Sequence, residues 1–333
     1  MRFSVRRMDY ADAQAISGWR YAAPYDVYAE DLPKEPPELY RALVDMDGTL
    51  CGFFCWGEAA QTAAGADLVK AHSDWLDFGI GLRPDLTGKG MGLWACQAAL
   101  GWLRGRFHPP AFRLSVYDWN ERAQRVYGRL GFVPLTVRGD FLVMVRDERP
   151  WLDATRPLEN GMPVYYADPG FDRHLHYHKE NCGYDMSVFF MTAHTGTHVD
   201  APAHLGMPGD TESLPLDRLN GVVYVAAWPM PEDTLPQSPR MLFKTGGRGL
   251  TLAEAQGLVE AGVDLIGLDA MSAGEGEEEY AVHKLLLERG VLIVENIALE
   301  AFDPGWYDMR CLPLRMPGSD GAPVRLQLRK ALL

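Results

Sequence analysis

The segment from His194 to His204 constrains the fold of this chain more than any other. Its sequence, HTGTHVDAPAH, places four side chains that can bind a metal within eleven residues. Imidazole and carboxylate together suit Zn²⁺ or Mn²⁺. In an extended strand His194, His198 and Asp200 would share a face, but four extended residues span about 13 Å, too far to share one ion. The chain must therefore bend between the histidines, and Gly196 permits the bend while Pro202 prevents a continuous helix.

A second pair of candidate ligands lies far along the chain. His283 falls on a predicted helix over 278–290, and Glu295 ends the apolar run of a predicted strand over 291–297. The helix rises about 9 Å from His283 to its end, and the strand returns about 13 Å. If the two elements pack antiparallel, these side chains meet at one edge of a sheet. A buried glutamate needs a partner, and a cation is one; a purely structural histidine is the alternative for His283.

The first half of the chain contains a glycine-rich connection. Residues 77–92, DFGIGLRPDLTGKGMG, join a predicted strand over 75–82 to a predicted amphipathic helix over 90–107. Gly88, Gly90 and Gly92 let the backbone approach a ligand, and the N-terminus of the helix favours an anion such as a pyrophosphate, with Lys89 adding charge. Because any turn from strand to helix favours glycine, the loop alone is equally consistent with a plain connection.

The context of this loop favours a binding site. About thirty residues further on, Asn120 precedes the predicted helix NERAQRVYGRLG, which carries Tyr127, and a predicted hairpin over 132–147 follows. With these motifs, residues 1–148 resemble the GNAT acetyltransferase family. The resemblance implies a central mixed sheet, acetyl-CoA as the cofactor, an amine as the acceptor, and Tyr127 as the residue that protonates the leaving thiolate. By the same resemblance the CoA-binding residues are Leu82, Thr87, Gly88, Lys89, Gly90, Gly92 and Asn120.

One position departs from the family pattern. The first position of the glycine motif is usually Arg or Gln, and here it is Thr87. The backbone donors do not depend on that side chain, but one side-chain contact to phosphate is lost. The sequence does not identify the general base; Asp77 and Glu58 are candidates, with an ordinary surface or strand-end carboxylate as the alternative for each.

From about residue 150 to the end, the chain resembles the cyclase family that includes kynurenine formamidases and isatin hydrolases. The resemblance rests on GMPVY, HTGTHVDAPAHL, the helix histidine with the strand glutamate, and LPLRMPGSDGAPVR. It implies a swivelling β/β/α fold within an overall α/β (α+β) class. It also implies a first metal held by His194, His198 and Asp200, and a second held by Asp200, His283 and Glu295, so that Asp200 bridges them. His204 would be the general acid and base, and Zn²⁺ is preferred over Mn²⁺.

Other residues near these motifs are weaker candidates. His174, His176 and His178 occur at every second position, so all three can lie on one face of a strand. That strand is either an exposed one near the mouth of the site or one that contacts the substrate. Asp269 and Ser272 lie at the C-terminal edge of a predicted strand over 263–270, where they would help to shape a pocket. The resemblance further implies a homodimer or a larger homo-oligomer, because family pockets are often completed by a neighbouring subunit.

Length and composition limit the remaining possibilities. The chain has 333 residues, which favours two domains, and we expect 1–148 and 150–333, with 229–240 as a Pro-rich loop. A net charge of -13 disfavours nucleic acid and anionic membranes as partners. The five scattered cysteines do not form a disulfide pattern, and the sequence shows neither a signal peptide nor an apolar run long enough to cross a membrane. We therefore expect a cytoplasmic protein.

Three functions remain open at this point. The first is a bifunctional enzyme that combines an N-acetyltransferase with a metal-dependent amide or formamide hydrolase, with linked metabolites as the substrates of the two activities. The second is a hydrolase whose GNAT module senses CoA without catalysis, as the Thr87 departure suggests. The third is a non-hydrolytic cyclase or dehydratase on the same metal site, which the mass of the product would distinguish.

Overall fold

The computed structural model describes residues 3–29, 38–62, 66–166, 168–230 and 236–332, and it divides into two compact units. The first comprises Met1–Arg149 and the second Pro150–Leu333. The predicted Pro-rich loop over 229–240 lies in part outside the described residues. No helix in the described part of the chain is long and apolar enough to span a membrane.

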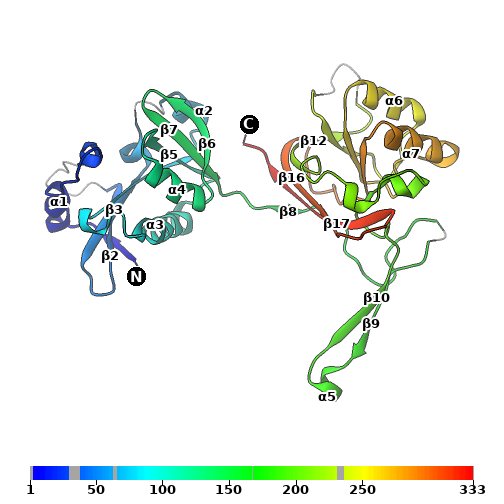
Figure 1. Ribbon diagram of the computed structural model, residues 1–333, viewed down its shortest axis with the longest axis horizontal. Helices are drawn as coiled ribbons and strands as arrows, with labels where there is room; N and C mark the ends of the chain where they lie inside the picture. Colours follow the sequence, from blue (N-terminus) through cyan, green and yellow to red (C-terminus); the bar gives the residue numbers. More distant parts are fainter. Residues whose placement is uncertain (1–2, 30–37, 63–65, 167, 231–235, 333) are drawn as a thin grey trace. The chain divides into compact units, whose positions relative to one another are not determined.

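The first unit is a mixed sheet with helices on it (Figure 1). The strand order is β1-β2-β3-β4-β5-β7-β6, and the only parallel neighbours among the paired strands described are β4 and β5. The strands are β1 (Ser4–Arg7), β2 (Tyr40–Val44), β3 (Leu50–Trp56), β4 (Leu76–Leu82), β5 (Ala111–Tyr117), β6 (Val133–Arg138) and β7 (Phe141–Asp147). The helices are α1 (Tyr10–Ser17), α2 (Ala66–Ala71), α3 (Met91–Phe107) and α4 (Glu121–Arg129).

Helix α3 supplies much of the core of this unit. Its buried residues recur at spacings of three and four, which places them on one face of the helix. That face packs with apolar residues of β3, β4 and β5, including Phe54, Phe78 and Phe112. The amphipathic helix predicted over 90–107 is therefore confirmed, and its N-terminus is held directly after the glycine loop.

The parallel strands β4 and β5 separate after their first residues. They pair only at Leu76 with Phe112 and at Asp77 with Arg113, although both strands continue for several residues. Both side chains of the second pair are buried, and the Arg113 guanidinium donates to the two Asp77 oxygens over 2.7 and 2.8 Å. Gln61 donates to the same carboxylate. Asp77 is thus a buried ion-pair partner at the start of β4, which agrees with the strand-end alternative and corrects the surface one.

Removing the Asp77 carboxylate is expected to destabilise the first unit strongly. In Asp77→Ala the Arg113 cation stays buried without a partner, which costs about 3–5 kcal/mol of unfolding free energy. Denaturant unfolding, followed by the fluorescence of the tryptophans, measures this loss. Asp85→Ala is the matched control, because its ion pair with Arg83 is exposed to solvent, and we expect no measurable change there. Equal stability of the Asp77 variant and the wild type would contradict the assignment.

The second unit is built on a closed ring of seven strands. The order β11-β15-β14-β13-β12-β16-β17 is closed by pairing of β17 with β11, and β8 pairs with a later stretch of β17. The strands are β8 (Leu152–Asp153), β11 (His198–Asp200), β12 (Asn220–Ala227), β13 (Arg240–Lys244), β14 (Leu265–Leu268), β15 (Leu292–Glu295), β16 (Gly305–Pro313) and β17 (Gly321–Lys330). Strands β12, β13, β14 and β15 are parallel to one another, and their helices are α6 (Leu252–Glu260) and α7 (Glu279–Glu288).

The parallel strands of this ring are buried on both faces. Along β15, Leu292 and Val294 belong to the core inside the ring, whereas Ile293 belongs to the core shared with α6 and α7. Strands β13 and β14 alternate in the same way, which explains why their sequences read as continuous apolar runs. Glu295 follows Val294, which points into the ring. Because successive side chains of a strand point to opposite faces, the Glu295 side chain lies outside the ring, on the face that α7 covers.

A two-stranded hairpin projects from the second unit (Figure 1). It consists of β9 (Asp172–Tyr177) and β10 (Met186–Phe190), with the short helix α5 (Lys179–Cys182) at its tip. Every residue of the two strands is exposed. His174 and His176 therefore lie on an exposed strand, as the first of the two interpretations predicts, and His178 precedes α5.

Candidate functional site

The short strand β11 holds the centre of the site. Val199 faces the core inside the ring, so His198 and Asp200 face the other side, where α7 lies. His198 is the register partner of Glu295 on β15, and Asp200 is the partner of Gly321 on β17. The strand that closes the ring thus brings the candidate ligands of the HTGTHVD segment next to the glutamate that ends VLIVE.

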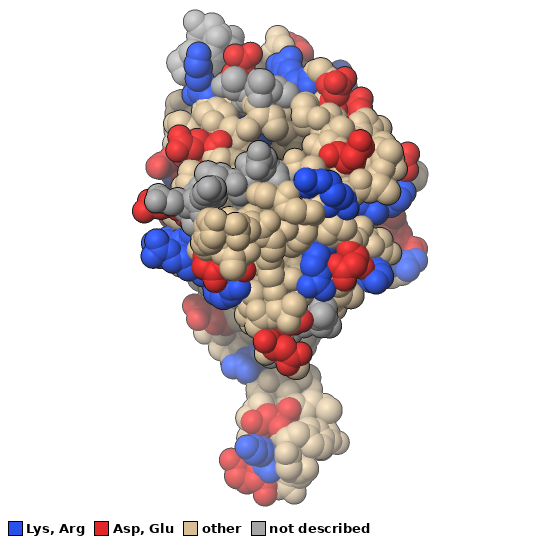
Figure 2. Space-filling model, turned by 90° about the vertical axis from the view of Figure 1, so that its left-hand side faces the viewer, with Lys and Arg blue, Asp and Glu red and all other residues tan. Residues whose placement is uncertain are grey.

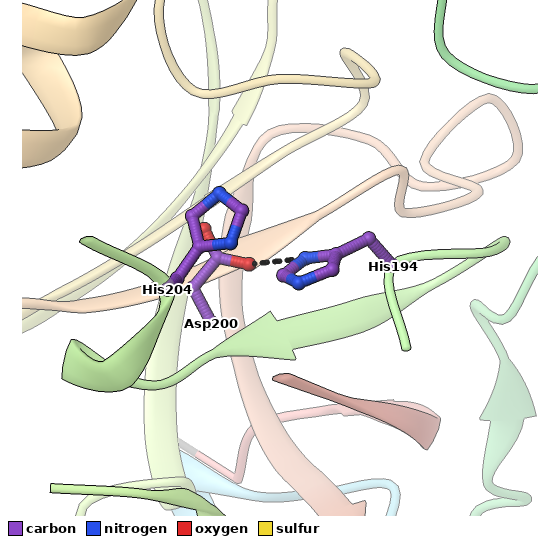
Figure 3. A group of neighbouring side chains, drawn as sticks. All are labelled: His194, Asp200 and His204. Atoms are coloured by element: carbon purple, nitrogen blue, oxygen red, sulfur yellow. Dashed lines mark hydrogen bonds and ion pairs between the residues drawn. The ribbon is translucent and has the colours of Figure 1, made fainter. Parts of the chain in front are cut away.

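His194 reaches this centre because the chain bends before β11. Gly196 has a φ of +71°, and a Cβ at that position would lie 2.6 Å from Leu158 Cδ2, so glycine is required there. His194 Nδ1 lies 3.0 Å from Asp200 Oδ1, the contact drawn in Figure 3. A Cβ on Gly321 would lie 2.7 Å from the His194 ring, so this glycine leaves room for the imidazole. The predicted bend at Gly196 is confirmed.

The two candidate ligands predicted far along the chain meet beneath α7. His283 Nε2 lies 3.0 Å from Glu295 Oε1 and 3.6 Å from Asp200 Oδ2. His198 Nε2 lies 3.1 Å from Glu295 Oε2 and 3.4 Å from Asp200 Oδ1. The antiparallel packing of helix and strand inferred from the sequence therefore does bring His283 to Glu295. All four side chains of this inner group are buried.

The donor atoms of this group suit a divalent cation. His198 Nδ1 and His283 Nδ1 each lie 2.9 Å from a backbone carbonyl, which leaves both Nε2 atoms directed at the carboxylates. His198 Nε2 and Asp200 Oδ2 are buried without a hydrogen-bond partner among the described residues. Two sets of closely spaced ligand atoms can be drawn here, and both contain Asp200. The first set is His194, Asp200 and His204, and the second is His198, Asp200 and Glu295.

The buried charges of the group shift each other's pKa values. Burial lowers the pKa of His198, but contacts with Asp200 and Glu295 outweigh burial and raise it to about 10. The same balance, with Glu295 as the main partner, raises the pKa of His283 to about 9. Burial raises the pKa of Asp200, but its contacts with His194 and His198 hold it well below its usual range. Without a metal, protonated imidazoles therefore compensate the buried carboxylates.

Asp320 is a site residue that the sequence interpretation missed. Its Oδ2 lies 2.9 Å from His194 Nε2 and 3.4 Å from His204 Nδ1, so one carboxylate connects both imidazoles. His204 lies on a 3-10 turn, Pro202–Leu205, and its ring is 4.3 Å from that of His194. Asp320 belongs to the GSDG segment near the end of the chain. The acidic residue between two glycines is the sequence signal that could have identified it as a site residue.

A cavity of about 660 Å³ opens at the carboxyl ends of the parallel strands. Its lining includes Asp269 and Ser272 after β14, and Asn296, which directly follows Glu295. Tyr165 and Met162 from the segment before the hairpin supply aromatic and apolar surface. The Asp269 carboxylate accepts hydrogen bonds from Thr245 and from the following glycines, so it fixes a loop of the lining.

The glycine loop of the first unit contains two glycines in the left-handed conformation directly before α3. Gly88 and Gly90 have φ values of +73° and +76°, and α3 begins immediately after Gly90. Lys89 is exposed, Gly92 packs close to Val126 of α4, and the Leu82 carbonyl accepts a hydrogen bond from Tyr21. The Thr87 hydroxyl donates to the Pro84 carbonyl, so it is turned into the loop.

Asn120 and Tyr127 lie on the helix that follows β5. The Asn120 side chain caps α4 by accepting from the Ala123 N–H, and it donates to the Tyr28 hydroxyl over 2.8 Å. Tyr127 packs with its ring centroid 5.9 Å from that of Phe132, and burial raises the pKa of its phenol well above the usual value. The phenol therefore keeps its proton at neutral pH.

The chain resembles known proteins in two separate regions. Residues 2–133 match the family model "Acetyltransferase (GNAT) domain", and residues 152–240 match "Putative cyclase". A kynurenine formamidase of Bacillus mycoides is 30% identical over 203 residues, which cover 54% of this chain and 97% of that protein.

Solved structures resemble the same two regions. One is described as a potential metal-dependent hydrolase with cyclase activity; it is 29% identical, with a TM-score of 0.48, over 55% of this chain and 98% of that one. A spermidine N-acetyltransferase chimera from Vibrio cholerae and hSSAT is 17% identical, with a TM-score of 0.33, over 44% of this chain and 96% of that one.

The matched regions define a fusion of an acyltransferase domain and a hydrolase-type domain. The N-terminal unit is a GNAT acetyltransferase domain with a mixed sheet. Through its C-terminal unit the chain belongs to the cyclase family of kynurenine formamidase-like, metal-dependent hydrolases.

Asp320→Asn is expected to impair this domain without unfolding it. The substitution weakens the hold on the His194 and His204 rings, and losing such an orienting partner lowers metal affinity or activity by about 10- to 100-fold. Hydrolysis of N-formylkynurenine and the affinity for Zn²⁺ measure the effect, with Asp303→Asn, at an exposed position, as the control. Wild-type values for both quantities in Asp320→Asn would contradict the role.

Proposed function

We propose that the C-terminal domain is a metal-dependent amide hydrolase of the arylformamidase type, acting on a small amide or formamide. The observation that carries this proposal is the buried group around Asp200, in which histidines and carboxylates from separate elements direct their atoms at one another. The named activity of the Bacillus relative supports a formamide as the first substrate to test.

The residues that would hold metal are taken from the resemblance, and the two ligand sets drawn from the geometry share Asp200 with them but group the other residues differently. His194, His198 and Asp200 would hold one ion, and Asp200, His283 and Glu295 a second, with Asp200 shared. A bound Zn²⁺ or Mn²⁺ supplies polarisation of the amide carbonyl and a lowered pKa for water. The buried Nε2 and Oδ2 atoms without hydrogen-bond partners support this assignment.

His204 is the proposed general acid and base. Its side chain is about one-third exposed, at the open side of the group, so it can reach a substrate and water. The Asp320 carboxylate lies beside its Nδ1 and orients the ring. His204 would accept a proton from the attacking water and pass it to the departing nitrogen, which must leave as a neutral amine.

Metal binding is expected to release protons. The pKa values of His198 and His283, about 10 and about 9, lie above their ordinary value, so both rings are protonated in the metal-free protein at neutral pH. A metal competes with those protons, and its affinity rises as pH increases toward these pKa values. Calorimetry of Zn²⁺ binding at pH 7, in buffers with different ionisation enthalpies, measures the release; binding without proton release would contradict the ligand assignment.

His204→Ala is expected to slow hydrolysis strongly while metal is retained. Losing the proton shuttle lowers the rate by about 10²- to 10⁴-fold. Metal content and N-formylkynurenine hydrolysis are measured together, with His72→Ala in the other domain as the control. Full activity in His204→Ala would contradict its role. Bound metal without formamide cleavage by the wild type would instead redirect the search to lactams or to the cyclase or dehydratase alternative, which product mass identifies.

We further propose that the N-terminal domain transfers acetyl from acetyl-CoA to a small amine. The support is the glycine loop at the start of α3, the separation of β4 from β5, and the protonated Tyr127, which can donate to a leaving thiolate. The inward Thr87 hydroxyl favours the alternative of a CoA sensor. Titration with acetyl-CoA and an amine panel, including the hydrolase product, separates them: turnover supports the transferase, and binding without turnover supports the sensor.

The proposed partners are therefore small molecules and a further copy of the chain. On the face in Figure 2, blue and red residues are interspersed, and those drawn in colour form no continuous basic surface for nucleic acid.

The hairpin exposes Tyr184, Phe189 and Phe190, and a two-stranded hairpin is at best marginally stable alone. A homo-oligomer would cover it. Sedimentation of the wild type tests this, and a monomer at micromolar concentration would contradict it.

A further inference from the structure

The glycine loop of the acetyltransferase domain has Thr87 at the position where its family usually has Arg or Gln. The Thr87 hydroxyl is used within the loop. Arg83 is also engaged, because it pairs with Asp85 over 2.6 Å and donates to the Leu50 carbonyl. Lys89 is exposed and makes no contact with a described residue that would fix it over the loop. A polyanionic ligand would therefore find little fixed positive charge on the loop itself.

A cation from the neighbouring helix lies over the same loop. A Cβ built on Gly88 would lie 4.0 Å from Arg122 Nη1. Val126, one helical turn after Arg122 on the same face of α4, lies 3.6 Å from where a Cβ of Gly92 would be. Arg122 and Val126 thus lie along the glycine loop, Arg122 beside Gly88 and Val126 beside Gly92 at the first turn of α3.

The Arg122 side chain is held in place without using its hydrogen-bond donors. Its Cζ lies 4.0 Å from the ring centroid of Tyr25, and that ring packs 5.6 Å from the ring of Trp119. Stacking on an aromatic face fixes the plane of a guanidinium and leaves its N–H groups at the edge available. Among the described residues, no carboxylate or carbonyl accepts a hydrogen bond from Arg122.

We propose that Arg122 binds the pyrophosphate of the acyl donor, and that it supplies the charge that Thr87 does not. The inference rests on the proposed acetyl-CoA-dependent function and adds a donor-binding residue to it. A guanidinium matches phosphate oxygens better than a lysine does, because it can donate two parallel hydrogen bonds. Tyr25 is then a positioning residue, since it acts only through the orientation of Arg122.

The test is calorimetric binding of CoA, 3′-dephospho-CoA and pantetheine to the full chain. In Arg122→Gln we expect the dissociation constants of both CoA forms to rise about ten- to a hundredfold, because a hydrogen bond to a charged group is lost. Pantetheine, which has no phosphate, should bind as it does to the wild type. Arg122→Lys should recover part of the loss, and unchanged thermal unfolding shows that the variant is folded.

Arg125→Gln is the matched control, because Arg125 lies on the same helix and pairs with Glu121 in solvent. It should bind every ligand as the wild type does. Equal CoA affinity of Arg122→Gln and the wild type would overturn the inference, and so would a loss seen with CoA but absent with 3′-dephospho-CoA, since the contact would then be to the 3′-phosphate. A wild type that binds no CoA would instead refute the proposed function of the domain.

Discussion

The buried carboxylate of Asp200 is the constraint on which the second unit depends. Asp200 is 1% exposed, at the end of the strand that closes the seven-stranded ring. An isolated carboxylate cannot be buried at such a place without cationic partners. His194, His198 and His283 provide them in the metal-free protein, and they arrive from a turn, a strand and a helix. The fold and the site are therefore specified by the same contacts.

Ring closure determines which side chains can join this group. Strand β11 pairs with β15 on one side and with β17 on the other. The first pairing brings Glu295 to one side of this short strand. The second brings Gly321, and Asp320 before it, to the other side. Gly196 and Gly321 remove the side chains that would collide with Leu158 and with the His194 ring. Two glycines and a three-residue strand thus set the spacing of the candidate ligands, and helix α7, which precedes β15, adds His283.

The sequence predicted the local parts of this arrangement better than the distant ones. The bend at Gly196 and the meeting of His283 with Glu295 followed from element lengths and from the geometry of helix and strand. Asp320 could not be found in this way, because its contact with His194 joins residues 126 positions apart through the pairing of β11 with β17. The ion pair of Asp77 was missed for a similar reason, since its partner Arg113 lies across a strand pair whose register the sequence does not reveal.

The central claim is that one shared carboxylate organises the metal site, and metal content tests it most directly. Mass spectrometry of the native protein should find about two metal ions per chain in the wild type, and Asp200→Asn, compared under conditions where circular dichroism shows it to be folded, should lose both. Asp308→Asn, which removes a surface-side partner of Arg329, should keep the metal. An Asp200→Asn protein that retains the full wild-type metal content would contradict the account.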